Sequence, residues 1–478
     1  MSVDGAPKSY DELVKLLEYD DKVKVAGIDV DGVLRGKVMQ KEKFLSIAKS
    51  ASRAFGFCSV IFGWDIHDQT YSRELSVSNL ANGYRDIECR IDFETYRRIP
   101  FEDNIALFLC TFLDPDSGAG LHACPRATLQ KISKQLMDEL DVTPWAGAEL
   151  EFFQFNENPT SAQNKQFRNL DVLTPGMHGY SMLRTQNSGP YFHDLYDTAR
   201  HFGIPIEILH TETGPGVYEA ALAYTDALRM ADNTTLFKLM AKSLGYKYNI
   251  MPTFMAKPHN NLPGCSGHIH VSLQDARGNN LFSLPEGKSR ADAKWDDLRC
   301  VSQEMEWFLA GILEGLPDVM PLLVPTVNGY KRLVENYWAP VNISWGYESR
   351  LASVRIIGPP LASPKATRLE IRVPGADMNP HYAFSILFAL GLHGIRNKLE
   401  LTIPPTSQVK AAEHSTTYQR LPKDLYAATE RFKHPNSLAR TVLGDKFVDH
   451  FAGTREHEWM VYSQTVTDWE MARYFELA

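Results

Sequence analysis

The chain has 478 residues, 44% of them hydrophobic and 23% charged, with a formal net charge of −8. This composition is ordinary for a globular protein long enough to form two domains, and the charge gives no reason to expect nucleic acid or an anionic membrane as a partner. Six cysteines without a CxxC pair indicate a reducing compartment, and the polar, acidic N-terminus is not typical of a signal or transit peptide, so we expect a cytoplasmic protein.

The N-terminal part predicts a hairpin followed by a helix. Residues 22–39 alternate in a strand-like way around Asp31-Gly32, a dipeptide suited to a tight turn. Helical spacing follows over 41–55, and a short buried strand is predicted at 104–113.

Two connecting segments are rich in turn formers. The first, residues 62–71, carries Asp65, His67 and Asp68, which a polar turn explains as well as a functional site does. The second, DPDSGAGL at 114–121, separates two apolar segments and is the best domain boundary. We therefore predict a tail over residues 1–20, an N-terminal domain over 21–117 and a larger domain over 118–478.

A strand with two carboxylates on one face is predicted at 145–155, after an amphipathic helix over 126–140. The sequence WAGAELEFFQF alternates with a period of two, so Glu149 and Glu151 share a face with Phe153 and Phe155. Burying two like charges is costly without a compensating cation. Taken alone, an edge strand with solvated glutamates would be the simpler interpretation.

Similar alternation returns twice further along the chain. The stretch 264–273 places His268, His270 and Ser272 on one face, and 367–375 does the same with Arg368, Glu370 and Arg372. Between them we expect a strand at 205–210, a helix at 231–246 and an extended segment at 251–257. The most apolar window, 307–327, contains Glu314, Asp318 and three prolines, which excludes a membrane span.

If the polar faces of these strands line one cavity, five carboxylates and one imidazole converge there. Such a set favours the hard ions Mg²⁺ or Mn²⁺ over zinc, and its size makes two or three ions plausible. The predicted ligands are Glu149, Glu151, Glu212, Glu219, His268 and Glu370.

Basic residues crowd the last third of the chain, where guanidinium groups would suit phosphate and carboxylate. Together with metals they indicate phosphoryl transfer, although the sequence has no Walker loop and no GxGxxG motif. These residues are Arg332, Arg350, Arg355, Lys365, Arg368 and Arg372.

Six motifs together resemble the glutamine synthetase superfamily in its long, bacterial-like form, over roughly residues 23–470. They are AELEFF, HTETGPGVYE, GHIHVSL, VNGYKRLVENYWAP, ESRLASVRI and SPKATRLEIRVPGADMNP. The resemblance implies an α+β protein with a small β-grasp-like N-terminal domain and a large catalytic domain, whose curved antiparallel sheet is flanked by helices. It also implies homo-oligomeric rings with active sites between neighbouring subunits.

The resemblance also implies a role for each matching residue. Glu151, Glu212 and Glu219 would hold one metal ion, and Glu149, His268 and Glu370 the other. Gly264, Arg332 and Arg372 would contact the amino-acid substrate, and Arg350 and Arg355 would counter charge on the transferred phosphoryl group. ATP would meet Tyr224, His270, Ser272, Lys365 and Arg368.

Three positions depart from the pattern of the ammonia-using members. Trp338 stands where those members carry an acidic residue that receives ammonium, and indole is a donor only and not a base. Val217 replaces a usual glutamine, and Pro263 replaces an asparagine that often contacts the substrate. The acid contributed across the subunit interface would be Asp65 or, next, Asp68.

The resemblance therefore predicts a ligase that uses ATP to phosphorylate the γ-carboxylate of glutamate and forms a γ-glutamyl amide with a primary amine or polyamine. Two alternatives stay open. The first is glutamine synthetase itself, using ammonia, with Trp338 as a gap filler. The second is a catalytically silent structural or nitrogen-sensing relative, against which the complete set of metal ligands argues.

Overall fold

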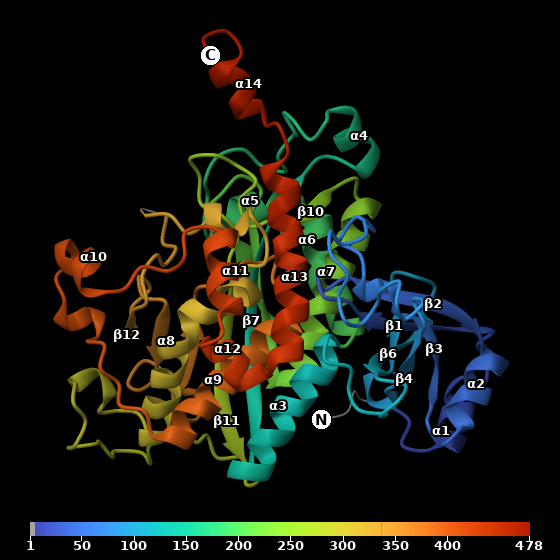
Figure 1. Cartoon of the computed structure of the whole chain (residues 1–478), viewed down its shortest axis with the longest axis horizontal. Helices are drawn as coiled ribbons and strands as arrows, with labels where there is room; N and C mark the ends of the chain where they lie inside the picture. Colours follow the sequence, from blue (N-terminus) through green and yellow to red (C-terminus); the bar gives the residue numbers. More distant parts are fainter. Residues whose placement is uncertain (1–4, 336) are drawn as a thin grey trace.

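The computed structural model describes residues 5–335 and 337–478. It is a mixed α+β protein in which a smaller N-terminal sheet, blue in Figure 1, lies beside a larger body of sheet and helices. The predicted fold class is thus confirmed. The β-grasp-like character of the N-terminal part and the three domain boundaries stay predictions.

The N-terminal sheet has six strands in the order β2-β1-β6-β4-β3, with β5 paired to β6. They are β1 (Lys22–Ile28), β2 (Leu34–Gln40), β3 (Ala54–Cys58), β4 (Asp86–Ile91), β5 (Arg97–Ile99) and β6 (Ile105–Leu113). The predicted hairpin is formed by β1 and β2, and Gly32 in its turn has a φ of +80°, which glycine adopts without strain. β6 is the predicted buried strand, and all of its residues are buried.

The helix predicted over 41–55 is too long. α2 (Lys41–Lys49) ends at Ser50, whose backbone is extended, and β3 begins at Ala54. Pairing of β3 with β4 satisfies backbone groups along both strands and buries the Phe57 side chain. Tertiary pairing therefore overrides the helical spacing of the sequence in the second half of this segment.

The larger sheet has eight strands in the order β12-β13-β14-β11-β7-β9-β8, with β10 paired to β7. They are β7 (Val142–Phe155), β8 (Ile206–Thr211), β9 (Tyr218–Asp226), β10 (Met251–Thr253), β11 (Gly267–Asp275), β12 (Trp345–Tyr347), β13 (Val354–Ile357) and β14 (Arg368–Ile371). All neighbours pair antiparallel except β12 and β13.

Long helices cover the apolar side of this sheet. α3 (Pro125–Leu140) and α7 (Ala227–Lys247) contact β7, and both also contact α9 (Pro380–Asn397), which packs on α8 (Gln303–Leu323). α8 contains most of the predicted apolar window, and among the described residues no helix is long and apolar enough to cross a membrane.

The remaining helices connect and surround these elements. In Figure 1 the C-terminal helix extends away from the body at the top. These helices are α1 (Tyr10–Leu16), α4 (Pro159–Asn164), α5 (Met182–Gln186), α6 (Gly189–His201), α10 (His414–Thr417), α11 (Leu425–Lys433), α12 (Leu438–Leu443), α13 (Asp445–Ser463) and α14 (Asp468–Tyr474).

At the centre of β7 one face is apolar and buried and the other is polar, as the alternation of the sequence predicted. Leu150 and Phe152 are fully buried, while Glu149 and Glu151 line a cavity on the other face. At the end of the strand Phe153 is also buried, with its ring 5.3 Å from that of His259. The polar face is therefore confined to the middle of the strand, where the cavity lies.

Three other predicted elements are present with shifted ends. The strand expected at 205–210 is β8, and the extended segment at 251–257 shortens to β10. α7 begins four residues before the predicted helix, because the side chain of Asp226 accepts a hydrogen bond from the backbone N–H of Arg229 and caps the first turn.

Candidate active site

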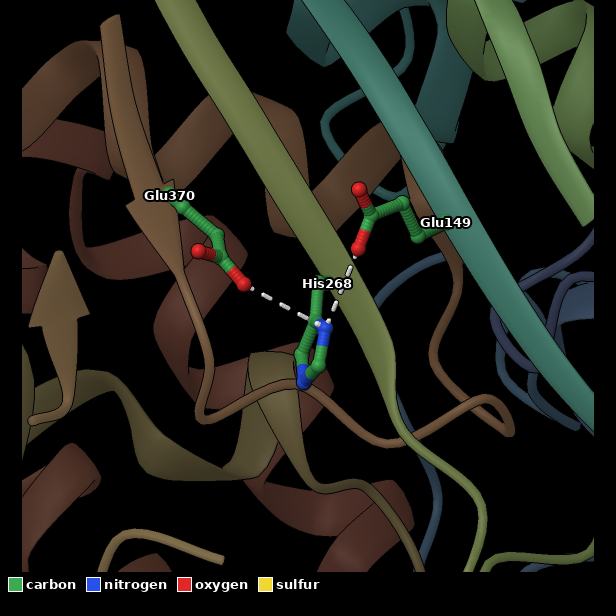
Figure 2. Close-up of side chains that lie close together, drawn as sticks. All are labelled: Glu149, His268 and Glu370. Atoms are coloured by element: carbon green, nitrogen blue, oxygen red, sulfur yellow. Dashed lines mark hydrogen bonds and ion pairs between the residues drawn. The ribbon is translucent and has the colours of Figure 1, made fainter. Parts of the chain in front are cut away.

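The first acidic cluster is built by the register of three adjacent strands. β11 pairs with β7 and with β14, which sets His268 opposite Glu149 and brings Glu370 to its other side. Nδ1 of His268 lies 3.3 Å from Oε2 of Glu149 and 3.4 Å from Oε1 of Glu370, as Figure 2 shows. This group matches the ligand set predicted for one metal ion.

Cations surround Glu370 from the other side. Arg355 donates from Nη1 to Oε2 of Glu370 at 3.0 Å, and Arg372 donates to Oε1. Burial alone would raise the pKa of Glu370, but His268 and Arg372 lower it to about 2. Burial also opposes ionisation of Glu149, yet His270 and His268 hold its pKa well below the usual range. Both carboxylates are therefore ionised at neutral pH.

A second cluster contains a histidine that the sequence did not reveal as a ligand. Donor atoms of His210, Glu212 and Glu219 all lie within 4.8 Å of one another. Nε2 of His210 lies 3.3 Å from Oε1 of Glu219, Nδ1 lies 3.0 Å from the carbonyl oxygen of Thr211, and the ring packs against Tyr180. The signal was the pairing of β8 with β9, which sets His210 opposite Glu219.

Glu151, expected with Glu212 and Glu219, lines the same cavity but has a different partner. Its carboxylate accepts hydrogen bonds from the backbone N–H and the hydroxyl of Ser266. Burial raises the pKa of Glu151 to about 7; His268 works against this shift, and Glu219, opposite it on β9, adds to it. A cation nearby would favour the ionised form.

Two members of each cluster and three arginines border one cavity of about 480 Å³, whereas Glu370 and His210 lie outside its lining. Arg332 and Arg372 give this cavity a cationic side, and Nε of each is buried without a hydrogen-bond partner among the described residues. Arg350 is exposed on its rim. The lining residues are Glu149, Glu151, Tyr180, Glu212, Thr213, Glu219, Pro263, Gly264, Ser266, His268, Arg332, Tyr337, Trp338, Ala339, Arg350 and Arg372.

Gly264 is required where the chain passes close to Arg332. A Cβ at this position would lie 2.3 Å from the carbonyl oxygen of Ala256 and 2.8 Å from Cγ of Arg332. Of the departures noted in the sequence, Pro263 lines the cavity, whereas Val217 is buried.

Trp338 stands at the mouth of the cavity with 61% of its surface exposed and a φ of +55°. A left-handed backbone is unfavourable for a bulky residue and is found mainly where the surroundings or function require it. The indole is therefore not part of the hydrophobic core, and the alternative that it fills a gap in its own segment stays open.

A second cavity of about 520 Å³ lies next to the first and shares Glu149 with it. Nε of Arg368 donates to Nδ1 of His270 at 3.0 Å, and Nε2 of His270 lies 2.9 Å from Oε1 of Glu149. All the residues predicted to contact ATP line this cavity, namely Tyr224, His270, Ser272, Lys365 and Arg368.

Two predicted catalytic residues lie outside both linings. Arg355 reaches the first cluster through Glu370 and also pairs with Glu348. Asp65 accepts hydrogen bonds from the backbone N–H groups of His67 and Gln69 and lies 3.2 Å from Nε2 of His457. Its predicted role in a neighbouring subunit stays a prediction.

Residues 122–474 match the family model of the glutamine synthetase catalytic domain. The chain belongs to the glutamine synthetase family. It is 42% identical to type-1 glutamine synthetase 2 of Dictyostelium discoideum over 95% of this chain and 84% of the relative. Members of the family are ligases that use ATP and divalent metals, and this chain is an ATP-dependent ligase of that family.

Two further relatives carry the names of amine ligases. Glutamate–isopropylamine ligase of Pseudomonas sp is 31% identical over 96% of this chain and 95% of its own, and gamma-glutamylethanolamide synthetase of Streptomyces coelicolor is 31% identical over 95% and 93%. The solved GmaS/ADP complex superposes with a TM-score of 0.79 at 23% identity, covering 97% of this chain and 99% of that one, which shows the fold.

The side chains fit the divalent cations that the family implies. Carboxylate oxygens with one imidazole in each cluster are a donor set suited to Mg²⁺ or Mn²⁺. One ion would be held by Glu149, His268 and Glu370. The other would be held by Glu212 and Glu219, with Glu151 or His210 completing the set.

Proposed function

We propose that this family member joins glutamate to a primary amine or polyamine, forming a γ-glutamyl amide at the expense of ATP. The observation that carries the proposal is the composition of the first cavity. It combines two buried guanidinium donors without acceptors, two acidic clusters and an exposed indole at the mouth. An anionic amino acid suits the end of the cavity that carries the guanidinium groups, and an amine with an apolar body suits the mouth that carries the indole.

ATP would occupy the second cavity with its phosphates directed toward Glu149, the residue common to both linings. Lys365 and Arg368 would pair with the phosphates, and Tyr224 would pack on the base. Bound Mg²⁺ or Mn²⁺ would offset the charge on the phosphates and on the transferred group.

The arginines of the first cavity would orient glutamate. Arg332 and Arg372 would bind its carboxylates, and the backbone at Gly264 would approach its amino-acid end. An oxygen of the γ-carboxylate attacks the γ-phosphorus of ATP, the bond to the β–γ bridging oxygen breaks, and ADP leaves. Arg350, exposed at the rim, would move against the negative charge that develops during this transfer.

The nitrogen nucleophile would enter past Trp338. Its lone pair attacks the acyl carbon of γ-glutamyl phosphate, phosphate leaves, and the nitrogen loses a proton to an ionised carboxylate, a group that Trp338 does not supply. The indole would bury the alkyl or aryl body of an amine and, with a second ammonium on a polyamine, form a cation–π contact.

Ammonia is the competing nucleophile, and one finding favours it: a relative at 42% identity is named a glutamine synthetase. In that case another acid would do the work that the acidic residue at the position of Trp338 performs in ammonia-using members. The indole would then serve only to cover the cavity.

Turnover with free amine and with ammonia separates the two candidates. At equal free-base concentrations, glutamate-dependent phosphate release should be faster with the best of a panel of primary amines and polyamines than with ammonia. Trp338→Glu should shift the ratio toward ammonia. Trp338→Ala should weaken amine use without improving ammonia use, and Trp295→Ala, far from the cavity lining, is the matched control. An unmodified enzyme that makes glutamine as fast as any γ-glutamyl amide would identify it as a glutamine synthetase.

A further inference from the structure

We propose that Lys257 is a positioning residue that fastens together the three segments on which the amine side of the first cavity is built. The inference deepens the proposed function and rests on it. Lys257 lies outside the cavity lining, and no role was expected for it from the sequence. It touches each of the segments that supply the lining residues Gly264, Arg332 and Tyr337.

The contacts of Lys257 run in three directions. Its Nζ donates to the carbonyl oxygen of Leu262, just before the turn that contains Pro263 and Gly264. The same ammonium lies 4.6 Å from the centroid of the Tyr337 ring. The backbone is held as firmly, because its N–H donates to Oδ1 of Asn328 at 2.7 Å and its carbonyl accepts from Nδ2 of Asn328 at 2.9 Å.

Asn328 connects this residue to the substrate arginine. It comes directly before the short 3₁₀ helix Gly329–Lys331, after which the chain reaches Arg332, whose N–H donates to Gly329. Gly264 packs against Arg332 with no room for a Cβ. Lys257 and Asn328 therefore link the loop that contains Gly264 to the segment that leads into Arg332.

The contact with Tyr337 fixes the other wall. Tyr337 precedes Trp338, whose backbone is left-handed and whose side chain is 61% exposed. A cation over an aromatic ring is directional and favourable, and Lys257 supplies it while its charge also binds Leu262. One ammonium thus connects the segment of Tyr337 and Trp338 to the loop that carries Gly264 at the glutamate end of the cavity. The ATP cavity shares none of these contacts.

The test is Lys257→Met, which keeps the length and packing of the side chain and removes its charge. We expect the KM for the amine and for glutamate to rise about tenfold, from loss of one cation–π contact and one charged hydrogen bond, while the KM for ATP changes less than twofold. Hydrogen exchange should speed up in residues 258–264 and 337–342 and nowhere else. Lys257→Arg should recover most of both effects.

Lys294→Met is the matched control, since Lys294 lies 4.8 Å from the ring of Trp295, away from both cavity linings. Equal behaviour of the two methionine variants would overturn the proposal, and so would a rise in the KM for ATP as large as that for the amine, which would mean general loosening. Turnover of the unmodified enzyme decides whether an amine or ammonia is the nucleophile, so a failure of the proposed function would be detected before any variant is measured. The variants are then compared using the nucleophile that the unmodified enzyme prefers.

Discussion

Each carboxylate of the first cluster lies beside a positive or ionisable partner, so the charges in the site depend on one another. Glu370 contacts Arg355 and Arg372 as well as His268, and it stays ionised although it is buried. Removing one member of such a buried group leaves the others unpaired, which costs about 3–5 kcal/mol in typical cases. Substitutions here should therefore be read with a measurement of folding beside the measurement of activity.

Arg350→Ala should lower kcat far more than it raises the KM for ATP. Arg350 is exposed at the rim of the cavity, so it contributes little to folding, and a charge brought against the transferred phosphoryl group acts mainly on the transition state. Loss of one such arginine typically reduces turnover on the order of 10³-fold. Steady-state kinetics on Arg350→Ala and on Arg299→Ala, an exposed arginine away from both cavities, would check this. A change confined to the KM for ATP would assign Arg350 to binding.

His210→Gln should weaken metal binding at one of the two sites and leave the affinity of the other site unchanged. His210 shares the second cluster with Glu212 and Glu219, whereas Glu149 belongs to the first. Titration of metal-free protein with Mn²⁺, followed by electron paramagnetic resonance, should show one affinity reduced about 10–100-fold, the range for removing a ligand or its supporting partner. His393→Gln is the control, because His393 also lies beside a glutamate, Glu314. Unchanged affinities would leave Glu151 as the third member of this set.

A site residue could be predicted from the sequence when alternation within its own strand decides which way it faces. It could not be predicted when only the pairing of that strand with another one decides its position. Period-two alternation was enough to place Glu149 and Glu151 on one face of their strand, and His268 on the polar face of its own strand. His210 escaped because β8 has no clear alternation, and only its pairing with β9 sets it opposite Glu219. For Asp65 the sequence could not show that backbone N–H groups of its own loop bind the carboxylate, and its role stays a prediction.

At the scale of elements, α13 contains a buried histidine whose charge state links stability to pH. His450 is 3% exposed, neither ring nitrogen has a hydrogen-bond partner in the described part of the chain, and its ring packs edge-on against His122. Burial, with further unfavourable contributions from His122 and Arg73, lowers the pKa of His450 to about 3. The histidine is therefore neutral in the folded protein at pH values where it would be protonated in the unfolded chain.

This difference predicts a loss of stability on acidification. Below the ordinary histidine pKa of about 6.5 the unfolded chain binds a proton that folded His450 does not, so stability falls as pH drops from about 6.5 toward 3, by up to about 1.4 kcal/mol per pH unit. His450→Leu should flatten the pH dependence of the free energy of unfolding between pH 6.5 and 5 in urea titrations. His393→Leu should leave the slope as it is, and equal slopes in the wild type and His450→Leu would contradict the assignment.

For the molecule as a whole, a single chain places the predicted nucleotide residues and all the predicted metal ligands except Glu370 in the linings of two adjoining cavities, but it places no predicted acid on the nitrogen side. Asp65 is held by its own loop, whereas Asp68 has a side chain that is 53% exposed and pairs only with Arg35 among the described residues. The exposed acid lies in the N-terminal part, away from the cavity linings. An assembly that brings this loop to a neighbouring copy would supply the missing group.

We therefore predict an oligomer whose active sites are shared between subunits. Light scattering should give a mass several times 54.0 kDa, and dilution to monomer should abolish turnover. Arg350→Ala and Asp68→Asn should each be nearly inactive alone, yet co-expressed chains should recover activity, because a site then combines Arg350 from one chain with Asp68 from its neighbour. Random mixing would restore roughly a quarter of the sites in a ring. Repeating the mixture with Asp65→Asn would tell which loop acid crosses the interface, and no recovery with either acid, or full activity in a monomer, would place the whole reaction within one chain.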